Sequence, residues 1–488
     1  MDRNYNMNKF SKLYREIPQG ARHACIYGLS IALMKGVSLI MLPFIAHHVT
    51  PTQFGKLEII TSIAMLSSVL IGMGLEQTLF RFAGSENNKT KSKLIASELF
   101  GITVIISILS FFLAWLISPL LSTLLPGGLS RYNIMLILAV VSLEGCISVP
   151  LGWMRMNNNI ILFFLSTTSR AIIQAILTAI FILLERGISG VLEASLIAAL
   201  LQSVILFCSH VRSAGISLNS ITTKITLIYG VPIVGSGMLS FAQNGFDRWI
   251  VVNTTSLIEL AQYGIALKFG LAVVLLFQPF TMWWNPKRFS ILNSTNGKTR
   301  FANSVSLGTV ILFIITPIVW MASPIIVHNM FPESYYGATQ YIIWVCTFML
   351  IKELTELYNV GCFCGNSTKT QFFINLTSSF VAILLMSILS KYYFVYGVIA
   401  ALICSQSLRF ILFYTSSQSI LKIAYPIKNL LYFSLFSISL YSLRLFLDHN
   451  IISALVSVSI PIAQILYASN IGLIPRISNI DGKHPCES

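Results

Sequence analysis

The sequence predicts an all-α integral membrane protein with about fourteen transmembrane helices. Fourteen apolar stretches, each near the roughly 20 residues that cross a bilayer core, follow one another with only short polar joints between them. Hydrophobic residues make up 55% of the 488 residues and charged residues only 10%, so lipid surrounds most of the chain. Because uninterrupted apolar runs satisfy their backbone groups within a helix, they favour a helical bundle over a barrel.

The polar joints fix the order of the spans. No joint is long enough to hold a soluble domain, so any chemistry takes place in the membrane. The spans are expected near residues 26–47, 59–79, 99–121, 134–153, 160–184, 191–208, 226–252, 260–280, 305–322, 341–360, 373–389, 397–414, 430–447 and 452–471.

The net charge of +15 is explained by topology and does not indicate a nucleic-acid partner. With the N-terminus in the cytoplasm, the cytoplasmic tails and joints hold twenty-one of the 32 basic residues. The outer joints hold five, namely Lys56, Arg131, Arg186, Lys391 and Arg444. This excess predicts that both termini are cytoplasmic. The polar first 25 residues lack the features of a signal peptide in their usual order, so the first span is the anchor.

Two short matches predict that the first twelve helices are a duplication. Thr52-Gln53-Phe54-Gly55 corresponds to Ala261-Gln262-Tyr263-Gly264 at an offset of 209, and Gly190-Val191 corresponds to Gly397-Val398 at an offset of 207. Six helices per copy is an even number, so the two six-helix lobes form a parallel repeat with a substrate path between them. The expected organisation is a basic tail (1–25), an N-lobe (26–210), a C-lobe (211–420), and a C-terminal helix pair with a short tail (421–488).

Several small or cyclic residues within the spans are expected to break or kink helices. They are Gly72, Gly74, Pro150, Pro232, Gly235, Gly237, Pro279, Pro317 and Pro324. Aromatic residues near span ends are interpreted mainly as interface anchors: Trp153, Trp249, Trp283, Trp284, Tyr335 and Tyr336. The eight cysteines mostly fall inside spans without a CxxC pair, so they are interpreted as apolar packing residues. No metal site and no cofactor is predicted.

Basic residues inside the spans are the strongest functional signal. A cation at bilayer depth costs about 2.5 to 3.5 kcal/mol, so such residues tend to line a cavity or to pair. Six fall within spans: Lys35, Arg170, Arg248, Lys268, Lys352 and Arg409. Buried ion pairs or snorkelling side chains are the structural alternative, and they are favoured for Arg409 or Arg170 alone.

The acidic residues well inside spans are fewer: Glu144, Asp247, Glu353 and Glu356. The excess of cations predicts an anionic substrate head, with Lys35, Arg248, Lys268, Arg170 and Lys352 as candidate substrate-binding residues. Asp247, Glu353 and Glu356 are the candidate ion-coupling residues, because close carboxylates raise each other's proton affinity. Adjacent helical positions point about 100° apart, so Asp247 and Arg248 are expected to find separate partners.

Several stretches resemble the Wzx-type polysaccharide flippases of the multidrug/oligosaccharidyl-lipid/polysaccharide exporter superfamily. They are Leu42-Pro43-Phe44, Thr50-Pro51-Thr52-Gln53-Phe54-Gly55, the run from Gly74 to Phe82, Phe246-Asp247-Arg248, and the run from Gln262 to Lys268. The resemblance spans helices one to twelve. It implies a multi-pass transporter of the bacterial inner membrane that moves undecaprenyl-pyrophosphate-linked oligosaccharide units to the periplasmic face for O-antigen or capsule assembly.

The resemblance also implies the partners and the alternatives. The partners would be the lipid-linked oligosaccharide, the membrane and other polysaccharide assembly proteins such as a polymerase or a chain-length regulator. A drug or lipid II exporter of the same superfamily is the transporter alternative, although a drug cavity should favour acids. A membrane glycan polymerase or ligase is the enzyme alternative, but the large periplasmic loop that it should carry is not in the sequence.

Overall fold

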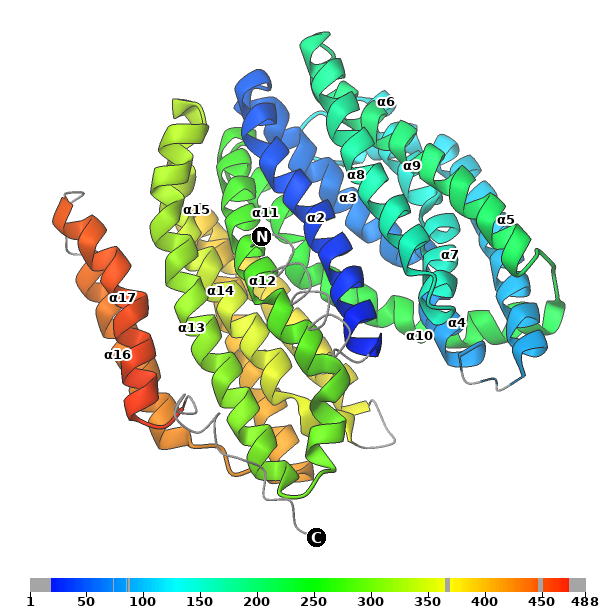
Figure 1. Cartoon of the computed structure of the whole chain (residues 1–488). Helices are drawn as coiled ribbons and strands as arrows, with labels where there is room; N and C mark the ends of the chain where they lie inside the picture. Colours follow the sequence, from blue (N-terminus) through cyan, green and yellow to red (C-terminus); the bar gives the residue numbers. More distant parts are fainter. Residues whose placement is uncertain are drawn as a thin grey trace, which may run out of the picture. The chain divides into compact units, whose positions relative to one another are not determined.

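The protein is helical throughout the part of the chain that the structure describes. The computed structural model describes residues 19–72, 74–84, 86, 88–364, 369–445 and 451–473, and within these ranges every predicted span overlaps a helix (Figure 1). Nine of the helices in these ranges are long and apolar enough to cross a membrane. The predicted all-α membrane fold is therefore confirmed. Residues 1–18 and 474–488 of the predicted tails lie outside the described residues.

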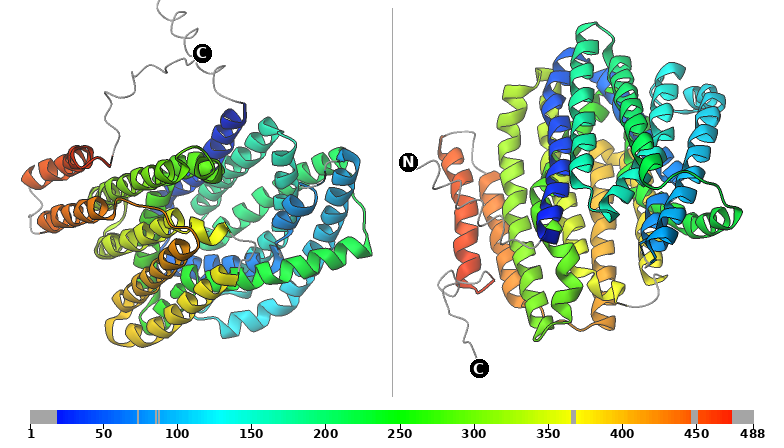
Figure 2. Two further views of the ribbon diagram at one scale, coloured as in Figure 1. Left: turned by 90° about the horizontal axis from the view of Figure 1, so that it is seen from below. Right: turned by 45° about the vertical axis from the view of Figure 1, so that its right-hand side comes forward.

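The chain divides into two compact units, Met1–Gly264 and Ile265–Ser488. In the first unit α8 packs along both α2 and α9, and α2 lies beside α8 in the further views (Figure 2). The helices of this unit are α2 (Gln19–His48), α3 (Pro51–Gly72), α4 (Leu75–Phe82), α5 (Lys89–Leu124), α6 (Arg131–Ser142), α7 (Glu144–Met156), α8 (Ile160–Leu183), α9 (Gly187–Ser213), α10 (Ser220–Asn244), α11 (Asp247–Thr254) and the start of α12 (Leu257–Leu292).

Three predicted spans of the first unit are broken into two helices. The second span ends at Gly72 and restarts after Gly74, whose φ of +62° suits glycine, so the break expected there is confirmed. The other two breaks differ from the expectation. Pro150 lies inside α7 and Pro232 lies inside α10, while the chain is interrupted between α6 and α7 and between α10 and α11. The prolines therefore do not mark where these two spans break.

The seventh predicted span packs with the first unit. Its two parts, α10 and α11, contact α3, and α10 also contacts α4 and α5. In Figure 1, α10 runs across the ends of α4 and α5 and does not follow them lengthwise. The sequence repeat, by contrast, assigns this span to the second copy. The repeat describes the likeness of two sequence halves, whereas the units describe how the folded chain packs.

The second unit contains the remainder of α12, then α13 (Gly297–Met330), η1 (Glu333–Ala338), α14 (Thr339–Tyr358), η2 (Val360–Phe363), α15 (Lys369–Ile420), α16 (Ile427–Leu445) and α17 (Ile451–Asn470). The element α15 is two helices joined at Phe394, which has φ 51° and ψ −127°. Arg409 and Asn375 are hydrogen-bonded across this turn, although a straight helix would separate them by about 51 Å. The two halves are the eleventh and twelfth predicted spans.

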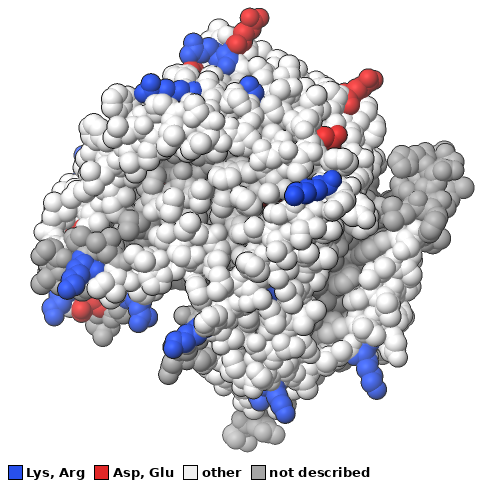
Figure 3. Space-filling model, turned by 180° about the vertical axis from the view of Figure 1, so that it is seen from behind, with Lys and Arg blue, Asp and Glu red and all other residues white. Residues whose placement is uncertain are grey.

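Large apolar side chains cover most of the surface, as lipid contact requires. Leu116, Leu183 and Phe380 are among many that are more than half exposed. The space-filling view shows mostly uncharged surface, with most charged side chains near its margins (Figure 3). A soluble protein would not leave so much apolar area open to water.

Three of the aromatic residues interpreted as interface anchors lie in the interior instead. Trp153 packs in a core with Phe100 and Leu79 in the first unit, while Trp284 packs in the core of the second unit, and Tyr335 is fully buried. Their position near a span end indicated the interface, but neighbouring helices cover them. Trp283 fits the prediction better, since it is 41% exposed and has Lys287 over its ring.

Candidate functional site

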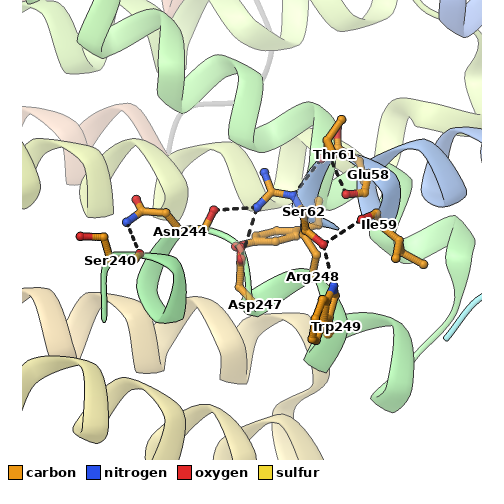
Figure 4. Close-up of polar contacts among 10 residues, drawn as sticks. Glu58, Ile59, Thr61, Ser62, Ser240, Asn244, Asp247, Arg248 and Trp249 are labelled. Atoms are coloured by element: carbon orange, nitrogen blue, oxygen red, sulfur yellow. Dashed lines mark hydrogen bonds and ion pairs between the residues drawn. The ribbon is translucent and has the colours of Figure 1, made fainter. Parts of the chain in front are cut away.

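The first unit contains a buried ionic network, which we call the Arg248 network (Glu58, Asp247, Arg248 and Tyr263). Arg248 Nε donates to Glu58 Oε2 at 3.0 Å, and its Nη1 lies 3.3 Å from Asp247 Oδ1 (Figure 4). The Tyr263 hydroxyl donates to Asp247 Oδ2 at 2.6 Å. Arg248 is 5% exposed and the two carboxylates are 1% exposed, so the network joins α3, α11 and the start of α12 away from solvent.

Close helix packing brings this network together. The two copies of the repeated motif each end in a glycine where α3 and α12 meet. A Cβ at Gly55 would lie 2.1 Å from the carbonyl oxygen of Leu257, and a Cβ at Gly264 would lie 2.5 Å from Cγ of Glu58. Neither helix could approach so closely with a larger residue. Glycine at these two positions therefore allows Glu58 to reach Arg248.

Asp247 and Arg248 pair with each other, so the expectation that they find separate partners is wrong for this pair. The expectation followed the directions of the Cβ atoms, but the long arginine side chain folds back toward the start of α11. There its Nη1 also donates to the Asn244 carbonyl at 3.0 Å, at the C-terminal end of α10 where carbonyls lack helical partners. The guanidinium thus bridges the break between α10 and α11 and is shared by two carboxylates.

Trp249 lies beside the network and lines a separate apolar pocket. Its indole nitrogen donates to Ser62 Oγ at 2.6 Å (Figure 4). The pocket has a volume of about 260 Å³ and lies between α3 and α5, where Ser67 and Ser110 are its hydroxyl-bearing residues.

A second polar group of the first unit is the first arginine–amide centre (Arg170 and Gln202). Arg170 Nη1 on α8 donates to Gln202 Oε1 on α9 at 3.0 Å. Gln202 is buried, and its Nε2 donates to the Ser166 carbonyl at 3.2 Å, which fixes the orientation of the amide. The negative charge of Glu144 acts on Arg170. Lys35 is half-buried on α2, the helix that packs along α8.

The second unit contains a comparable group, the second arginine–amide centre (Arg409 and Asn375). Arg409 Nε donates to Asn375 Oδ1 at 2.9 Å, and its Nη2 lies 3.2 Å from Glu356 Oε1. The guanidinium also lies over the Phe413 ring at 5.0 Å. Asn359 Nδ2 donates to Glu356 Oε2 at 2.9 Å. The side chain of Glu356 is 48% exposed, so this centre is open on one side.

The remaining predicted residues lie near this second centre or on α12. Lys352 and Glu353 are half-buried on α14, and the charges of Glu353, Arg409 and Glu356 all act on Lys352. Lys268 is half-buried on α12. Just beyond the apolar part of α12, burial lowers the pKa of Arg288 below its ordinary value, while the negative charge of Glu356 opposes this shift.

Five residues of these groups are absent from the candidate sites that the sequence indicates: Glu58, Tyr263, Gln202, Asn375 and Arg409, the last of which the sequence indicates only as a cation inside a span. Glu58 lies at the edge of the span predicted at 59–79, where a carboxylate can reach water, and uncharged amides inside spans carry no charge signal. The 207 residues between Gln202 and Arg409 equal one of the two offsets of the sequence repeat, so the repeat could have indicated Gln202 as a site residue. Within the described ranges, no three His, Cys, Asp or Glu side chains gather as a metal site would require.

Membrane-length apolar helices with guanidinium groups hydrogen-bonded between them define the class: a multi-pass helical membrane protein with charged interior sites. Comparison with known families then identifies the chain. It belongs to the polysaccharide biosynthesis protein family, whose model matches residues 21–291, more than half of the sequence. No curated protein sequence matches the chain.

Solved transporters share the fold. The chain resembles the "Lipid II flippase MurJ, inward closed conformation" with a TM-score of 0.72 at 14% identity, over 92% of this chain and 100% of that one. It resembles the "MATE multidrug transporter DinF-BH" with a TM-score of 0.60 at 14% identity, over 82% and 95% of the two chains. A "MOP superfamily transporter from Pyrococcus furiosus" follows, with a TM-score of 0.53 at 13% identity, over 83% and 98%. The TM-scores show a common fold, and at 13–14% identity the likeness shows the fold alone.

Proposed function

We propose that the protein translocates undecaprenyl-pyrophosphate-linked oligosaccharide repeat units from the cytoplasmic to the periplasmic face of the bacterial inner membrane, for O-antigen or capsule assembly. The observation that carries this proposal is a set of arginine side chains held by hydrogen bonds inside membrane-length helices of a polysaccharide biosynthesis family member. A lipid with an anionic head matches such an interior, because the head needs cations while the tail can stay in the bilayer.

The substrate-binding residues that we propose are Lys35, Arg170, Arg248, Lys268 and Lys352. They differ in burial and in ion pairing in this conformation. Arg248 is enclosed by two carboxylates, so it could bind a pyrophosphate only after Glu58 or Asp247 had moved away. Lys35 and Arg170 are half-buried on packed helices and are better placed to meet an anion. They are therefore the first residues to test.

For ion coupling we propose Asp247, Glu353 and Glu356. Asp247 is buried beside Arg248 and accepts a hydrogen bond from Tyr263. Glu356 is paired with Arg409 but remains half-exposed, so it could exchange a proton with water on one side. Movement of either carboxylate away from its arginine would favour protonation, because the arginine stabilises the charged form.

We further propose that the two lobes are a parallel repeat with its boundary near residue 210. Both termini are proposed to be cytoplasmic. A polymerase and a chain-length regulator are the proposed partners. The twenty-one inner basic residues support the orientation. Lipid II export is the main alternative, because a lipid II flippase shares the fold. Drug export agrees less well with the interior cations, because a site for cationic drugs should be acidic. A polymerase or ligase agrees less well with a fold that the chain shares with solved transporters.

The decisive experiment is translocation by the purified full-length protein in liposomes. The undecaprenyl-pyrophosphate-linked repeat unit from the source cell and lipid II would be compared as substrates, with protein-free liposomes as the control. We expect faster movement of the repeat unit than of lipid II. Movement of lipid II alone would replace the proposed function with the alternative. In a second experiment, a strain in which this protein is deleted should lose its surface glycan.

A further inference from the structure

The two arginine–amide centres are alike in geometry, although each lies in its own unit. In the first centre an arginine on α8 donates to an amide oxygen on the neighbouring α9 at 3.0 Å. In the second centre an arginine in the last half of α15 donates to an amide oxygen in the first half at 2.9 Å. In both, one guanidinium–amide hydrogen bond joins two successive membrane helices at depth.

The positions correspond in the sequence repeat, with the partners exchanged. Asn375 follows Arg170 by 205 residues, and Arg409 follows Gln202 by 207 residues, close to the offsets of 207 and 209 in the repeated motifs. The amide of the eleventh span thus lies two to four residues before the position that corresponds to the arginine of the fifth. A carboxylate repeats as well, since Glu353 follows Glu144 by 209 residues.

Each amide oxygen accepts one hydrogen bond from its arginine, so it occupies only one of the N–H donors of the guanidinium. Gln202 uses its Nε2 on the Ser166 carbonyl, so its oxygen can only face Arg170. A guanidinium has five N–H donors, and the hydrogen bond to Gln202 takes only one of those of Arg170. Arg409 gives one nitrogen to Asn375 and another to Glu356, and its side chain is 16% exposed. Each arginine therefore keeps donors for a further acceptor.

We propose that the two centres are equivalent anion sites, one in each repeat, in which Arg170 and Arg409 bind the diphosphate of the lipid-linked substrate and Gln202 and Asn375 are their positioning residues. The inference rests on the proposed function and deepens it. A neutral amide suits this task, because it orients the guanidinium without adding a negative charge to it. Arg409 already pairs with Glu356, so Glu356 has to release it before the diphosphate binds there. Phosphate oxygens can then use the remaining donors pairwise.

The alternative is that each arginine only pins two helices together. Two conservative substitutions separate these possibilities, Gln202→Glu and Asn375→Asp. Each keeps an acceptor of nearly the same shape and turns the amide hydrogen bond into an ion pair. In Asn375→Asp a pin would therefore be preserved or strengthened, whereas Gln202→Glu also loses the Nε2 donor to the Ser166 carbonyl and is expected to be less stable. The arginine charge, however, would be neutralised, so an anion site would be lost.

The test measures binding of sugar-free undecaprenyl pyrophosphate to the full-length protein in nanodiscs, together with the unfolding temperature of each variant. Uncharged undecaprenol is the control ligand for binding of the tail. We expect at least tenfold weaker binding of the diphosphate lipid in Gln202→Glu and in Asn375→Asp, with unchanged undecaprenol binding in both. The unfolding temperature of Asn375→Asp should be no lower than that of the wild type. The double variant Arg170→Gln with Gln202→Arg, which copies the order of the second centre, should bind more tightly than Arg170→Gln alone.

Wild-type affinity in both acidic variants would overturn this inference alone, since it would show that the arginines only pin helices. Absence of binding to the wild-type protein would overturn the proposed function and the inference together. If Gln202→Glu does not fold, Asn375→Asp in the other unit decides the outcome by the same comparison.

Discussion

The guanidinium of Arg248 lies 3.0 Å from the carboxylate of Glu58, a residue 190 positions earlier in the chain. Through this contact the broken seventh span is fastened to the second span inside the first unit. Asp247 shares the same guanidinium, and both carboxylates are buried. A buried charge that loses its partner is costly, so this pair makes a direct prediction about stability.

Arg248→Gln should destabilise the protein more than Glu58→Gln. The first substitution removes the guanidinium from two buried carboxylates and should cost about 3 to 5 kcal/mol, whereas the second leaves Arg248 paired with Asp247. The measurement is thermal unfolding of each purified variant in the same detergent. Equal unfolding temperatures for the two variants would contradict the prediction that Asp247 keeps Arg248 paired after Glu58 has been neutralised, and wild-type temperatures for both would show that the network does not stabilise the protein.

Gly55→Ala should lower stability by about 1 to 3 kcal/mol, because its Cβ would lie 2.1 Å from a backbone oxygen of Leu257 that cannot turn away. Gly264→Ala should cost less, since the atom that it meets is in the Glu58 side chain. Gly36→Ala in α2 is the matched control: nothing lies within 4 Å of its Cβ, so alanine should leave stability unchanged or raise it. Unfolding temperatures that rank these variants differently would contradict the close packing of α3 and α12.

Lys35→Gln should lower transport while leaving the amount of protein in the membrane normal. A charge-assisted hydrogen bond to a phosphate is worth about 1.5 to 3 kcal/mol, so its loss should reduce transport roughly ten- to a hundredfold. Surface glycan in a complemented deletion strain, normalised to membrane protein, is the measurement, and Lys35→Arg is the control that keeps the charge. Wild-type glycan in the glutamine variant would assign Lys35 a structural role.

Both termini should be cytoplasmic, with fourteen crossings between them. The excess of basic residues in the inner joints is the reason. Reporter fusions after Ser488 and in the joint at Asn88 should both behave as cytoplasmic, while a fusion in the outer joint at Gly127 should behave as periplasmic. A periplasmic C-terminus would mean that one span does not cross the membrane.

If a proton gradient drives transport, Asp247→Asn and Glu356→Gln should each reduce the response to an imposed pH difference in liposomes. Asp247 is held in the Arg248 network and Glu356 by Arg409, so both can change partner as helices move. Tyr263→Phe is a milder variant, because it removes only the 2.6 Å hydrogen bond to Asp247 and should cost about 1 kcal/mol. Transport that follows the membrane potential but ignores pH and sodium gradients would remove these carboxylates from the mechanism.

Only part of the Arg248 network could be predicted from the sequence. Arg248 and Asp247 were visible because a charged residue inside an apolar run is a local signal. Glu58 was not, since it lies near a span end where a carboxylate can reach water. Only the crossing of α3 over the start of α12, made possible by Gly55 and Gly264, buries Glu58 and brings it to the guanidinium.

By itself the sequence determined the all-helical membrane fold and the order of its apolar spans, because the length and composition of an apolar run are properties of neighbouring residues. It also determined which side chains carry charge into the membrane. The tertiary structure alone decided where the fourth and seventh spans break, that Trp153 and Trp284 are buried, and which partners Arg170, Arg248 and Arg409 have. These features depend on contacts between helices that are distant in the chain, and no local pattern of residues records which faces will meet.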